Sequence, residues 1–266
     1  MRHLLLFLLV LFCMVMHGQP TTPGAAAAAL GGSYVTQQSA VSARHNVAGI
    51  AGLQQHTIAA GIRNNYLAND LNDFYLLSTF KAGSGRLGID LLYYGFDAWQ
   101  QGEVGLSYAR PLAANWFLGA RVSYAYNYIP QERVSRHLVA ADLGLLGILG
   151  KWRVGASLQQ FAQSQWRGRV QERAPIVFRV GGGYYFSPQT SISAELFKAD
   201  NSGADIRLGL AYAPADALAL RFGFSTLQPS VAFGVGLFFN QIQVNIAAAW
   251  HQQLGLSPVI DGVYAW

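Results

Sequence analysis

The side chains of this chain best suited to chemistry are its charged residues, which recur at alternate positions of short apolar segments. Those that share one face of these segments are Arg86, Asp90, Glu103, Arg121, Arg153, Arg179, Glu195, Asp205, Arg207, Arg221 and Asp261. Neighbouring segments carry opposite signs, as with Glu103 and Arg121 or Glu195 and Arg207. This pattern predicts either a network of ion pairs that fills an interior or a lining that guides an ionic or polar solute.

A second chemistry to consider is hydrolysis by a serine nucleophile. Ser135 and His137 would share one face of a strand, and Glu132 is close to them in sequence. Further acidic residues are expected in loops at the same end, namely Asp70, Asp73 and Asp97. A catalytic triad requires its nucleophile and base within hydrogen-bonding reach, and no other feature of the sequence marks this pair. We therefore expect a protein that is not an enzyme.

Cofactor, metal and nucleic-acid sites are not indicated. Gly181–Gly183 lies within an alternating apolar segment and lacks the Lys and Ser or Thr of a phosphate-binding loop. These glycines predict a β-bulge or room for a neighbouring segment. The histidines show no metal-ligand spacing. The net charge of +5 is scattered without a run of Lys or Arg, which argues against nucleic-acid binding.

The N-terminus is typical of a secretory signal peptide. Arg2 and His3 precede the apolar stretch Leu4–Met16, and a cleavage site follows Gly18. We expect residues 1–18 to be the signal peptide, because a retained helical anchor would need roughly 20 apolar residues. The single cysteine, Cys13, lies inside this stretch. The mature protein should therefore have neither disulfides nor thiolate metal ligands.

The composition indicates a membrane protein without a spanning helix. Of the 266 residues, 52% are hydrophobic and 12% are charged, against about 25% charged in a soluble domain. After the N-terminus, apolar runs stay well below the roughly 20 residues of a spanning helix. A closed β-barrel instead satisfies its backbone hydrogen bonds between strands. The composition therefore favours a barrel.

Strand periodicity dominates from residue 53 onward. In one segment, Ile242, Val244 and Ile246 share a face, and Gln243 and Asn245 share the other. Such faces suit lipid outside a barrel and a crowded lumen inside it. Fourteen segments can be delimited, at 53–63, 73–81, 86–95, 102–110, 115–128, 136–149, 151–162, 175–187, 190–198, 204–213, 217–226, 230–239, 241–251 and 256–266.

One of these segments is ambiguous. Residues 136–149 are rich in Ala and Leu, which favour a helix, whereas Gly144, Gly147 and Gly150 argue against one. A soluble β-sandwich is a further alternative for the whole chain, because it would also alternate. It would need far more charge on its outer faces than this sequence provides.

The connections between segments alternate in length. Every second one is short, at Ala82–Gly85, Pro111–Ala114, Gly150, Ser187–Gln189, Pro214–Asp216 and Asn240. Those between them are mostly longer, at Asn64–Asn72, Phe96–Gln101, Ile129–Ser135, Ala162–Ala174 and Ala199–Gly203. Outer-membrane barrels have short periplasmic turns and longer outer loops. We therefore expect an all-β fold, a closed antiparallel transmembrane β-barrel of about fourteen strands over residues 53–266, in the outer membrane of a Gram-negative cell.

Two local features predict contacts of this barrel. Ile260, Tyr264 and Trp266 share one face of the last segment, and a C-terminal aromatic on such a strand is the usual assembly signal of outer-membrane barrels. Tyr264 and Trp266 are therefore predicted to be recognised by the barrel assembly machinery.

The loop Gln165–Arg173 gathers several arginines around a Trp. It predicts either contacts to lipopolysaccharide phosphates or a partner protein, or simply a solvated loop.

Residues 19–52 differ from the rest of the chain. They are rich in small residues, including Ala25–Ala29, which predicts a segment packed inside the barrel as a luminal hatch. Leu30–Tyr34 and Asn46–Ala51 resemble the N-terminal signature of FadL-related outer-membrane barrels, in particular the PorV/PorQ type of Bacteroidota. The residues that carry this resemblance are Gly31, Gly32, Tyr34, Asn46, Ala48 and Gly49. Val47 departs from it, because the family motif has proline there.

The resemblance implies a fourteen-stranded barrel with a luminal hatch, and it leaves two functions open. The first is a non-enzymatic accessory of protein secretion of the type IX kind, which short outer loops favour. The second is a FadL-like passive channel for small hydrophobic solutes. The implied partners are outer-membrane lipid and the barrel assembly machinery, together with secretion-system components or a small apolar ligand.

Overall fold

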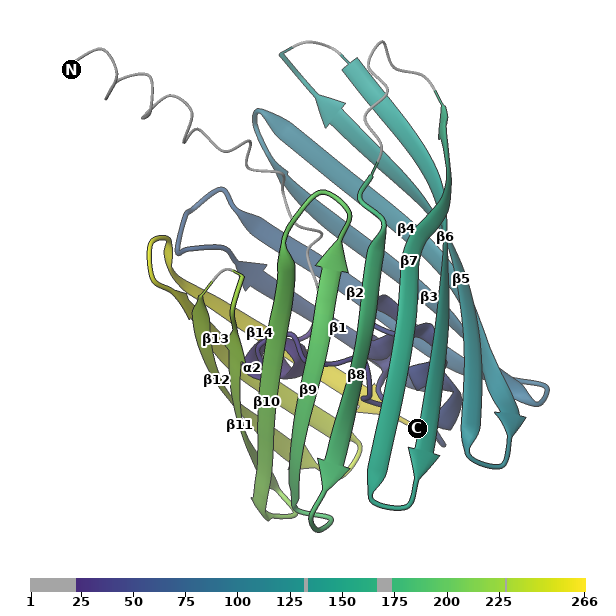
Figure 1. Ribbon diagram of the computed structural model, residues 1–266. Helices are drawn as coiled ribbons and strands as arrows, with labels where there is room; N and C mark the ends of the chain where they lie inside the picture. Colours follow the sequence, from purple (N-terminus) through teal and green to yellow (C-terminus); the bar gives the residue numbers. More distant parts are fainter. Residues whose placement is uncertain (1–22, 132–133, 167–173, 228) are drawn as a thin grey trace, which may run out of the picture.

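The chain forms a closed barrel of antiparallel strands (Figure 1). The computed structural model describes residues 23–131, 134–166, 174–227 and 229–266. Consecutive strands are neighbours throughout, and the barrel closes where β1 (Thr57–Asn64) pairs with β14 (Gly255–Ala265). The predicted all-β barrel of fourteen strands is confirmed. The predicted signal peptide, the first residues of the predicted hatch segment and most of the arginine-rich loop lie outside the described residues.

The remaining strands follow the predicted segments closely. They are β2 (Asn72–Ala82), β3 (Gly85–Phe96), β4 (Trp99–Ala113), β5 (Trp116–Ile129), β6 (Val134–Leu149), β7 (Trp152–Trp166), β8 (Val177–Tyr185), β9 (Thr190–Ala199), β10 (Ala204–Ala215), β11 (Leu218–Ser225), β12 (Ser230–Phe239) and β13 (Ile242–His251). The ambiguous segment is β6, a strand paired on both sides. Pairing with its two neighbours therefore overrides the helical propensity of its Ala and Leu residues.

Several predicted boundaries are wrong, including the end of β7, which runs to Trp166 rather than to residue 162. Residues 53–56 precede β1, because the N-terminal segment reaches the wall only at Thr57. Pro111 and Pro214 lie inside β4 and β10, each beside a register shift that accommodates a residue without an N–H. The predicted long loop after Phe96 is a hairpin in which residues 97–98 join β3 to β4. Both strands of this hairpin therefore extend further than the apolar pattern suggested.

The outer face of the barrel is apolar. Ile246 on β13 is 51% exposed, whereas Asn245 and Ala247 beside it are 2% and 3% exposed. The same alternation runs along most other strands, and their exposed rows are largely Leu, Ile, Val, Phe and Tyr. A water-facing surface would carry charge there. This outer face therefore has the chemistry that a bilayer accepts.

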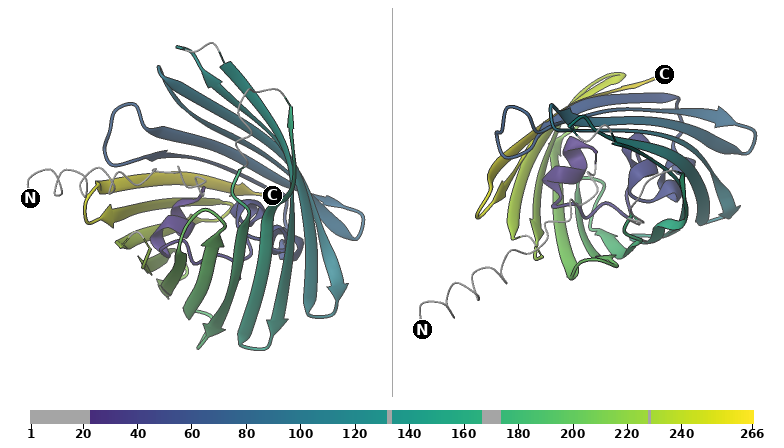
Figure 2. Two further views of the ribbon diagram at one scale, coloured as in Figure 1. Left: turned by 45° about the horizontal axis from the view of Figure 1, so that its top comes forward. Right: turned by 90° about the horizontal axis from the view of Figure 1, so that it is seen from above.

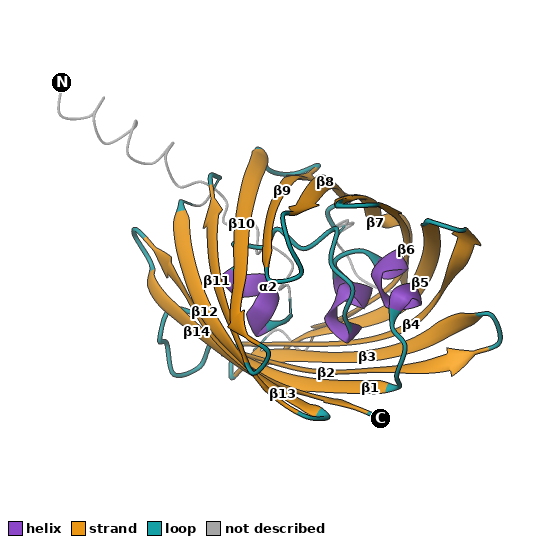
Figure 3. Ribbon diagram, turned by 90° about the horizontal axis from the view of Figure 1, so that it is seen from below, coloured by secondary structure: helices purple, strands orange, loops and turns teal. Residues whose placement is uncertain are grey.

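The N-terminal segment lies inside the barrel (Figures 2 and 3). Its short helix α2 (Ala25–Ala29) packs on β11 to β14. The 3₁₀ turn η1 (Ala40–Arg44) packs on β1 to β3, and the 3₁₀ turn η2 (Val47–Gly52) packs on β3 to β6. Within the described part of the chain, none of the helices is long and apolar enough to cross a membrane. Because these three short elements pack on the inner side of the strands, a second layer of backbone occupies the lumen.

The wall is irregular at one point in β7. Gln160 has φ 57°, and the register with β6 shifts beside it. The Asp142 carboxylate accepts a hydrogen bond from the Gln160 N–H at 2.7 Å. A side chain of β6 thereby satisfies the amide that the irregularity removes from the ladder.

Pairing between β7 and β8 stops at the same level. The ladder ends at Gln159 and Val177, although β7 continues along β6 to Trp166. Beyond this point, Gln163 of β7 exchanges two side-chain hydrogen bonds with the backbone of Ala174, at 2.8 and 3.0 Å. A side-chain amide thus takes the place of strand pairing in this part of the wall.

A charge on the outer face tests the assignment of that face to lipid. We expect Ile246→Arg to lower the free energy of unfolding by about 2–4 kcal/mol, the cost of Arg near a bilayer midplane. Gln252→Arg in the exposed turn after β13 is the matched control and should have little effect. The measurement is urea unfolding in lipid vesicles. Equal effects of the two substitutions would contradict a lipid-facing outer row.

Candidate functional site

The luminal hatch, residues 23–56, packs against wall positions that have no side chain. A Cβ at Gly223 would collide with the backbone of Gly31, and one at Gly119 would lie 2.7 Å from the backbone nitrogen of Ala48. Glycine at such wall positions lets two backbones approach each other closely. The hatch is thus fitted to this barrel rather than loosely enclosed by it.

The predicted glycine run in β8 serves the same purpose. Gly181–Gly183 keeps an unbroken register with both neighbouring strands, so it forms no bulge. A Cβ at Gly181 would lie 2.7 Å from the side chain of Val35 in the hatch. Of the two interpretations of this run, room for a neighbouring segment is the one that the structure supports.

Two wall carboxylates bind backbone amides of the hatch. Asp261 on β14 accepts a hydrogen bond from the Ala25 N–H at 2.6 Å. Glu195 on β9 accepts hydrogen bonds from the N–H groups of Tyr34 and Val35, both at 2.8 Å and both to one oxygen. All five residues are buried. These bonds satisfy amides that have no strand or helix partner, and they attach the hatch to opposite sides of the barrel.

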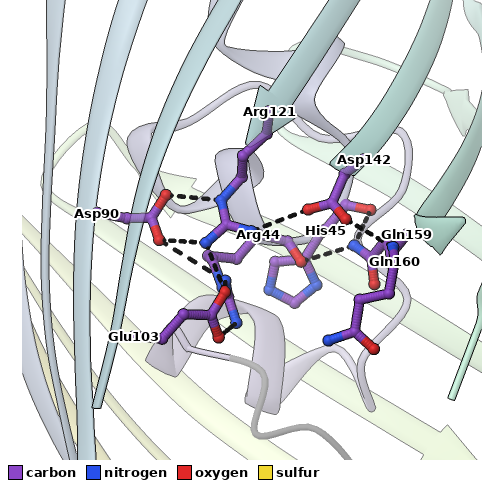
Figure 4. Close-up of polar contacts among 8 residues, drawn as sticks. All are labelled: Arg44, His45, Asp90, Glu103, Arg121, Asp142, Gln159 and Gln160. Carbon is purple, nitrogen blue, oxygen red and sulfur yellow. Dashed lines mark hydrogen bonds and ion pairs between the residues drawn. The ribbon is translucent and has the colours of Figure 1, made fainter. Parts of the chain in front are cut away.

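A third attachment is an ion pair between the hatch and a cluster of charges (Figure 4). Arg44 of η1 binds Glu103 on β4 through two hydrogen bonds, of 2.5 and 3.0 Å. Arg121 on β5 also binds Glu103 at 2.8 Å, and it bridges to Asp90 and Asp142 on the two sides. Three wall carboxylates therefore surround the two guanidinium groups. Because the cluster is buried, loss of any one member would leave an uncompensated charge.

A second buried cluster surrounds His45 of the hatch. Its Nε2 donates to the Pro23 carbonyl at 3.0 Å, and its Nδ1 accepts from Arg179 on β8 at 3.2 Å. Arg179 also donates to Glu195 at 3.1 Å and lies over the Phe197 ring. Burial, reinforced by the charge of Arg179, holds the pKa of His45 well below its usual value. His45 is therefore a neutral hydrogen-bonding link between hatch and wall.

The predicted luminal charges point inward, but one predicted pairing is wrong. Glu103 and Arg121 form an ion pair as expected. Glu195 and Arg207 are cross-strand partners, yet Glu195 pairs with Arg179 instead, and Arg207 pairs with Asp205 at 2.7 Å. Strand neighbours alone could not predict this arrangement. The Phe197 ring lies under both guanidinium groups and the hatch amides take the second Glu195 oxygen.

Three further charges of the predicted network contact the hatch, an aromatic ring and an amide side chain. Arg86 on β3 donates to the Leu53 carbonyl of the hatch at 2.6 Å. Arg153 lies over the Tyr185 ring at 4.1 Å from its centroid. Arg221 donates to Asn245 at 3.1 Å, and Asn245 in turn donates to Asp261 at 2.6 Å.

The predicted hatch motif residues have specific positions. Asn46 caps η2 by accepting from the Ala48 N–H, and its amide donates to the carbonyls of Val35 and Leu145. Tyr34 is buried, and its hydroxyl donates to Ser39.

The glycines of the motif lie where space or backbone conformation excludes a side chain. Gly31 and Gly32 have φ of 62° and 82°, in the left-handed region that favours glycine. A Cβ at Gly49 would collide with the Gln37 carbonyl. Each position of the motif thus has a packing or hydrogen-bonding reason.

Four residues of the site were not singled out from the sequence, namely Arg44, Tyr75, Asp142 and Asn245. Arg44 lies in the hatch, outside any periodic segment, and therefore could not be assigned to a face. Asp142 lies in the ambiguous segment 136–149. Asn245 was placed on the luminal face and Tyr75 alternates with apolar residues in the same way, but their partners come from strands and hatch residues distant in sequence.

Two cavities flank the hatch. The outer cavity, at the end of the barrel that bears the β1–β2 loop, has a volume of about 50 Å³; its lining includes Pro23, Arg44, Arg63, Tyr75, Tyr94, Glu103 and Gln160. The inner cavity, at the end that bears the C-terminus, has a volume of about 230 Å³; its lining includes Ala26, Tyr34, Gln38, Gln54, Thr57, Gln243, Asn245 and Asp261. The hatch lies between these spaces.

The residues considered for hydrolysis do not assemble into a triad among the described residues. His137 pairs with the Tyr124 hydroxyl at 2.6 Å through Nδ1 and stacks on that exposed ring. Asp73 lies buried in β2 rather than in a loop, and Glu132 is outside the described residues. Over the parts of the chain that the structure describes, no group of acidic, His or Cys residues could hold a metal ion.

The residues of the predicted assembly signal are exposed at the inner end of the barrel. Tyr264 and Trp266 stack with ring centroids 5.5 Å apart, and His56 and Phe80 lie beside Trp266. Their recognition by the assembly machinery stays a prediction.

Comparison with known proteins identifies similar folds. No protein-family model and no curated protein matches the chain. Among solved structures, the toluene transporter TbuX of Ralstonia pickettii aligns with a TM-score of 0.69 and 13% identity over 91% of this chain and 97% of that one. The P. putida toluene transporter TodX gives 0.70 and 12% over 92% and 98%, and a Pseudomonas aeruginosa FadL homologue gives 0.62 and 10% over 92% and 98%.

The chain has the FadL-type barrel fold. At identities of 10–13%, this likeness establishes fold and nothing finer. It agrees with the FadL-related part of the resemblance seen in the sequence. Membership of the PorV/PorQ branch stays a prediction.

Removing one wall carboxylate should release the hatch of this FadL-type barrel. Glu195→Gln leaves the fully buried Arg179 without its counter-charge, a loss that typically costs about 3–5 kcal/mol. Ser33→Cys, a nearly isosteric change at a residue 2% exposed, reports docking through its reactivity with a maleimide.

We expect Glu195→Gln to speed this labelling at least about tenfold, the factor that corresponds to 1.4 kcal/mol. Asp216→Asn, in the exposed turn between β10 and β11, is the matched control and should leave the rate unchanged. Slow labelling in both variants would contradict the anchoring role of Glu195.

The neutral His45 predicts a pH dependence with a defined sign. Because its pKa is lowered by burial and by Arg179, Arg207 and Arg44, the unfolded chain takes up a proton first as pH falls below about 6.5. Docking should therefore weaken below that pH and be constant above it. Hydrogen exchange of hatch amides, corrected for its intrinsic pH dependence, measures this. His45→Gln should flatten the response, and a persisting slope in that variant would assign it to another group.

Proposed function

We propose that this protein is a passive channel for small hydrophobic solutes in the outer membrane of a Gram-negative cell. The observation that carries the proposal is a FadL-type barrel whose lumen holds a fitted hatch with a cavity on each side. The two toluene transporters among the similar structures support hydrocarbons as the solute class.

The polar lumen fits this proposal, because many of its charges are paired, whereas Arg86, Arg153 and Arg221 contact a carbonyl, a ring and an amide. Arg121 is bound to three carboxylates, and Arg179 and Arg207 each have an acidic partner. A lining that guides ions would present charges without such partners to the passage. We therefore assign the luminal network to holding the hatch and the wall, and the cavities to the solute.

The outer cavity also borders the barrel wall at β7. Gln160 lines the outer cavity and marks the level at which pairing between β7 and β8 stops. The outer cavity therefore borders both the hatch and the part of the wall where, among the described residues, the ladder between β7 and β8 has ended. A solute held there has two directions in which to continue, past the hatch or toward the bilayer.

A role in protein secretion of the type IX kind stays a prediction from the sequence resemblance. The hatch fills the lumen at the level of the charge clusters, and the similar structures named above are transporters and a FadL homologue. A secretion accessory would act through partner proteins rather than through its lumen.

Uptake of labelled toluene tests the proposed function. Cells of a Gram-negative host that produce the protein should take up toluene several-fold faster than cells with an empty vector, and uptake of a small sugar should be unchanged. Deletion of the gene in its own host separates the alternatives. Impaired protein secretion with unchanged toluene uptake would contradict the channel and support the secretion accessory.

A further inference from the structure

The path that a solute takes past the hatch can be located, on the premise of the proposed channel function. Both cavities border the same part of the wall. Arg63 of β1 and Tyr75 of β2 line the outer cavity, and Thr57 of β1 and Asp261 of β14 line the inner one. Along β14, β1 and β2 the two spaces are separated by wall side chains such as Ala59 and Tyr75 and by the hatch residues packed in clusters with them.

One hydrogen bond lies on this boundary. The Tyr75 hydroxyl donates to Asp261 at 2.9 Å, across the intervening strand β1. Gly61 of β1 is the cross-strand partner of both residues, and a Cβ there would collide with the Tyr75 hydroxyl. Glycine at this position thus allows the phenol of one strand to reach the carboxylate two strands away.

The hatch crosses the same boundary in two places, between Pro23 and Ala26 and along η1, whose Arg44 lines the outer cavity and whose Ala40 and Val41 line the inner one. Pro23 lines the outer cavity and Ala26 lines the inner one, so the chain crosses from one to the other between them. The Ala25 N–H donates to the same Asp261 oxygen that accepts from Tyr75. Asp261 therefore joins the wall, the hatch and the tyrosine at one atom.

On the wall formed by β5 to β7, the hatch backbone lies directly on the strands. Gly119, Gly144 and Gly155 face hatch backbone atoms so closely that a Cβ would collide with them or lie within 2.9 Å of them. Opening a passage there would require moving the chain itself. At Tyr75 the wall contributes one side chain, held by one hydrogen bond and by packing in a cluster with Ala43 and Ile50.

We propose that the passage past the hatch runs along the inner face of β14, β1 and β2, and that the Tyr75–Asp261 hydrogen bond is its gate. In the closed state the Tyr75 side chain separates the two cavities. When it rotates away from Asp261, the outer cavity joins the inner one. Asp261 keeps the Ala25 amide and Asn245 as partners in the open state, so its carboxylate remains hydrogen-bonded.

Conductance of the purified mature protein in planar bilayers of neutral lipid, in potassium chloride, tests the gate without knowledge of the natural solute. Tyr75→Phe removes the hydroxyl but keeps the ring, and Tyr75→Ala removes both. We expect Tyr75→Phe to raise the open probability at least about fivefold, the factor expected for one hydrogen bond of ordinary strength. Tyr75→Ala should in addition raise the conductance of the open state.

Tyr185→Ala on β8 is the matched control. Tyr185 is a half-buried luminal tyrosine whose hydroxyl donates to Gln37 of the hatch at 3.3 Å, and it lines neither cavity. Its replacement should leave the conductance unchanged. Equal increases in the Tyr75 and Tyr185 variants would overturn the proposed location, and unchanged conductance of both correctly folded Tyr75 variants would overturn the gate.

Toluene uptake by the same variants separates this inference from the proposed function. Altered conductance of the Tyr75 variants with no toluene uptake by the wild type would retain the gate and contradict the solute class. Uptake by the wild type that is identical in Tyr75→Phe and Tyr75→Ala would retain the channel and overturn the gate. The solute would then leave elsewhere, with the poorly paired part of β7 and β8 as the next place to examine.

Discussion

The close approach of the hatch backbone to the barrel wall is the constraint on which the rest of the structure depends. A second layer of chain fits inside fourteen strands only where the inward rows lack bulk, as at Gly119 and Gly223. The hatch also brings amides into the lumen that no strand can pair. Glu195 and Asp261 satisfy such amides, and this requirement explains why acidic side chains project into a crowded interior. Space and hydrogen bonding therefore select glycine and carboxylate at particular inward positions.

The charges follow from the same constraint. Carboxylates that bind the hatch need counter-charges, and Arg121 and Arg179 supply them from neighbouring strands. Arg44 is the hatch member of one cluster, so an ion pair with Glu103 joins the hatch to the wall. Such an assembly resists displacement as a unit, because removing any buried partner leaves an isolated charge. A solute path is therefore expected where the contact between hatch and wall depends on a side chain that can rotate. On the proposed account this position is along β14, β1 and β2.

The barrel could be predicted from the sequence because its signal is local and repeated. Ile242, Val244 and Ile246 mark an outer face whatever strand lies next to them, and even the Ala- and Leu-rich segment 136–149 was assigned to a strand through its glycines. The inward orientation of the charges followed from the same periodicity. The partners of these charges could not be predicted in the same way. Arg207 pairs with Asp205 rather than with Glu195 because of where Phe197 and the hatch lie. The hatch itself has no periodicity, so Arg44 and His45 could be placed in a luminal segment but not beside Glu103 or Arg179.

The central claim is that the N-terminal segment is docked against the wall of the barrel, and a cross-link tests it most directly. The hydroxyls of Ser33 in the hatch and Ser193 on β9 are 2.9 Å apart. Cys13 is the sole cysteine of the sequence, so replacing it by serine makes a double variant, Ser33→Cys with Ser193→Cys, free of other thiols. The account predicts that these two cysteines form a disulfide in nearly all molecules in native outer membranes under mild oxidation. Two free thiols that both react rapidly with a maleimide would contradict it, because the segment would then lie away from the wall.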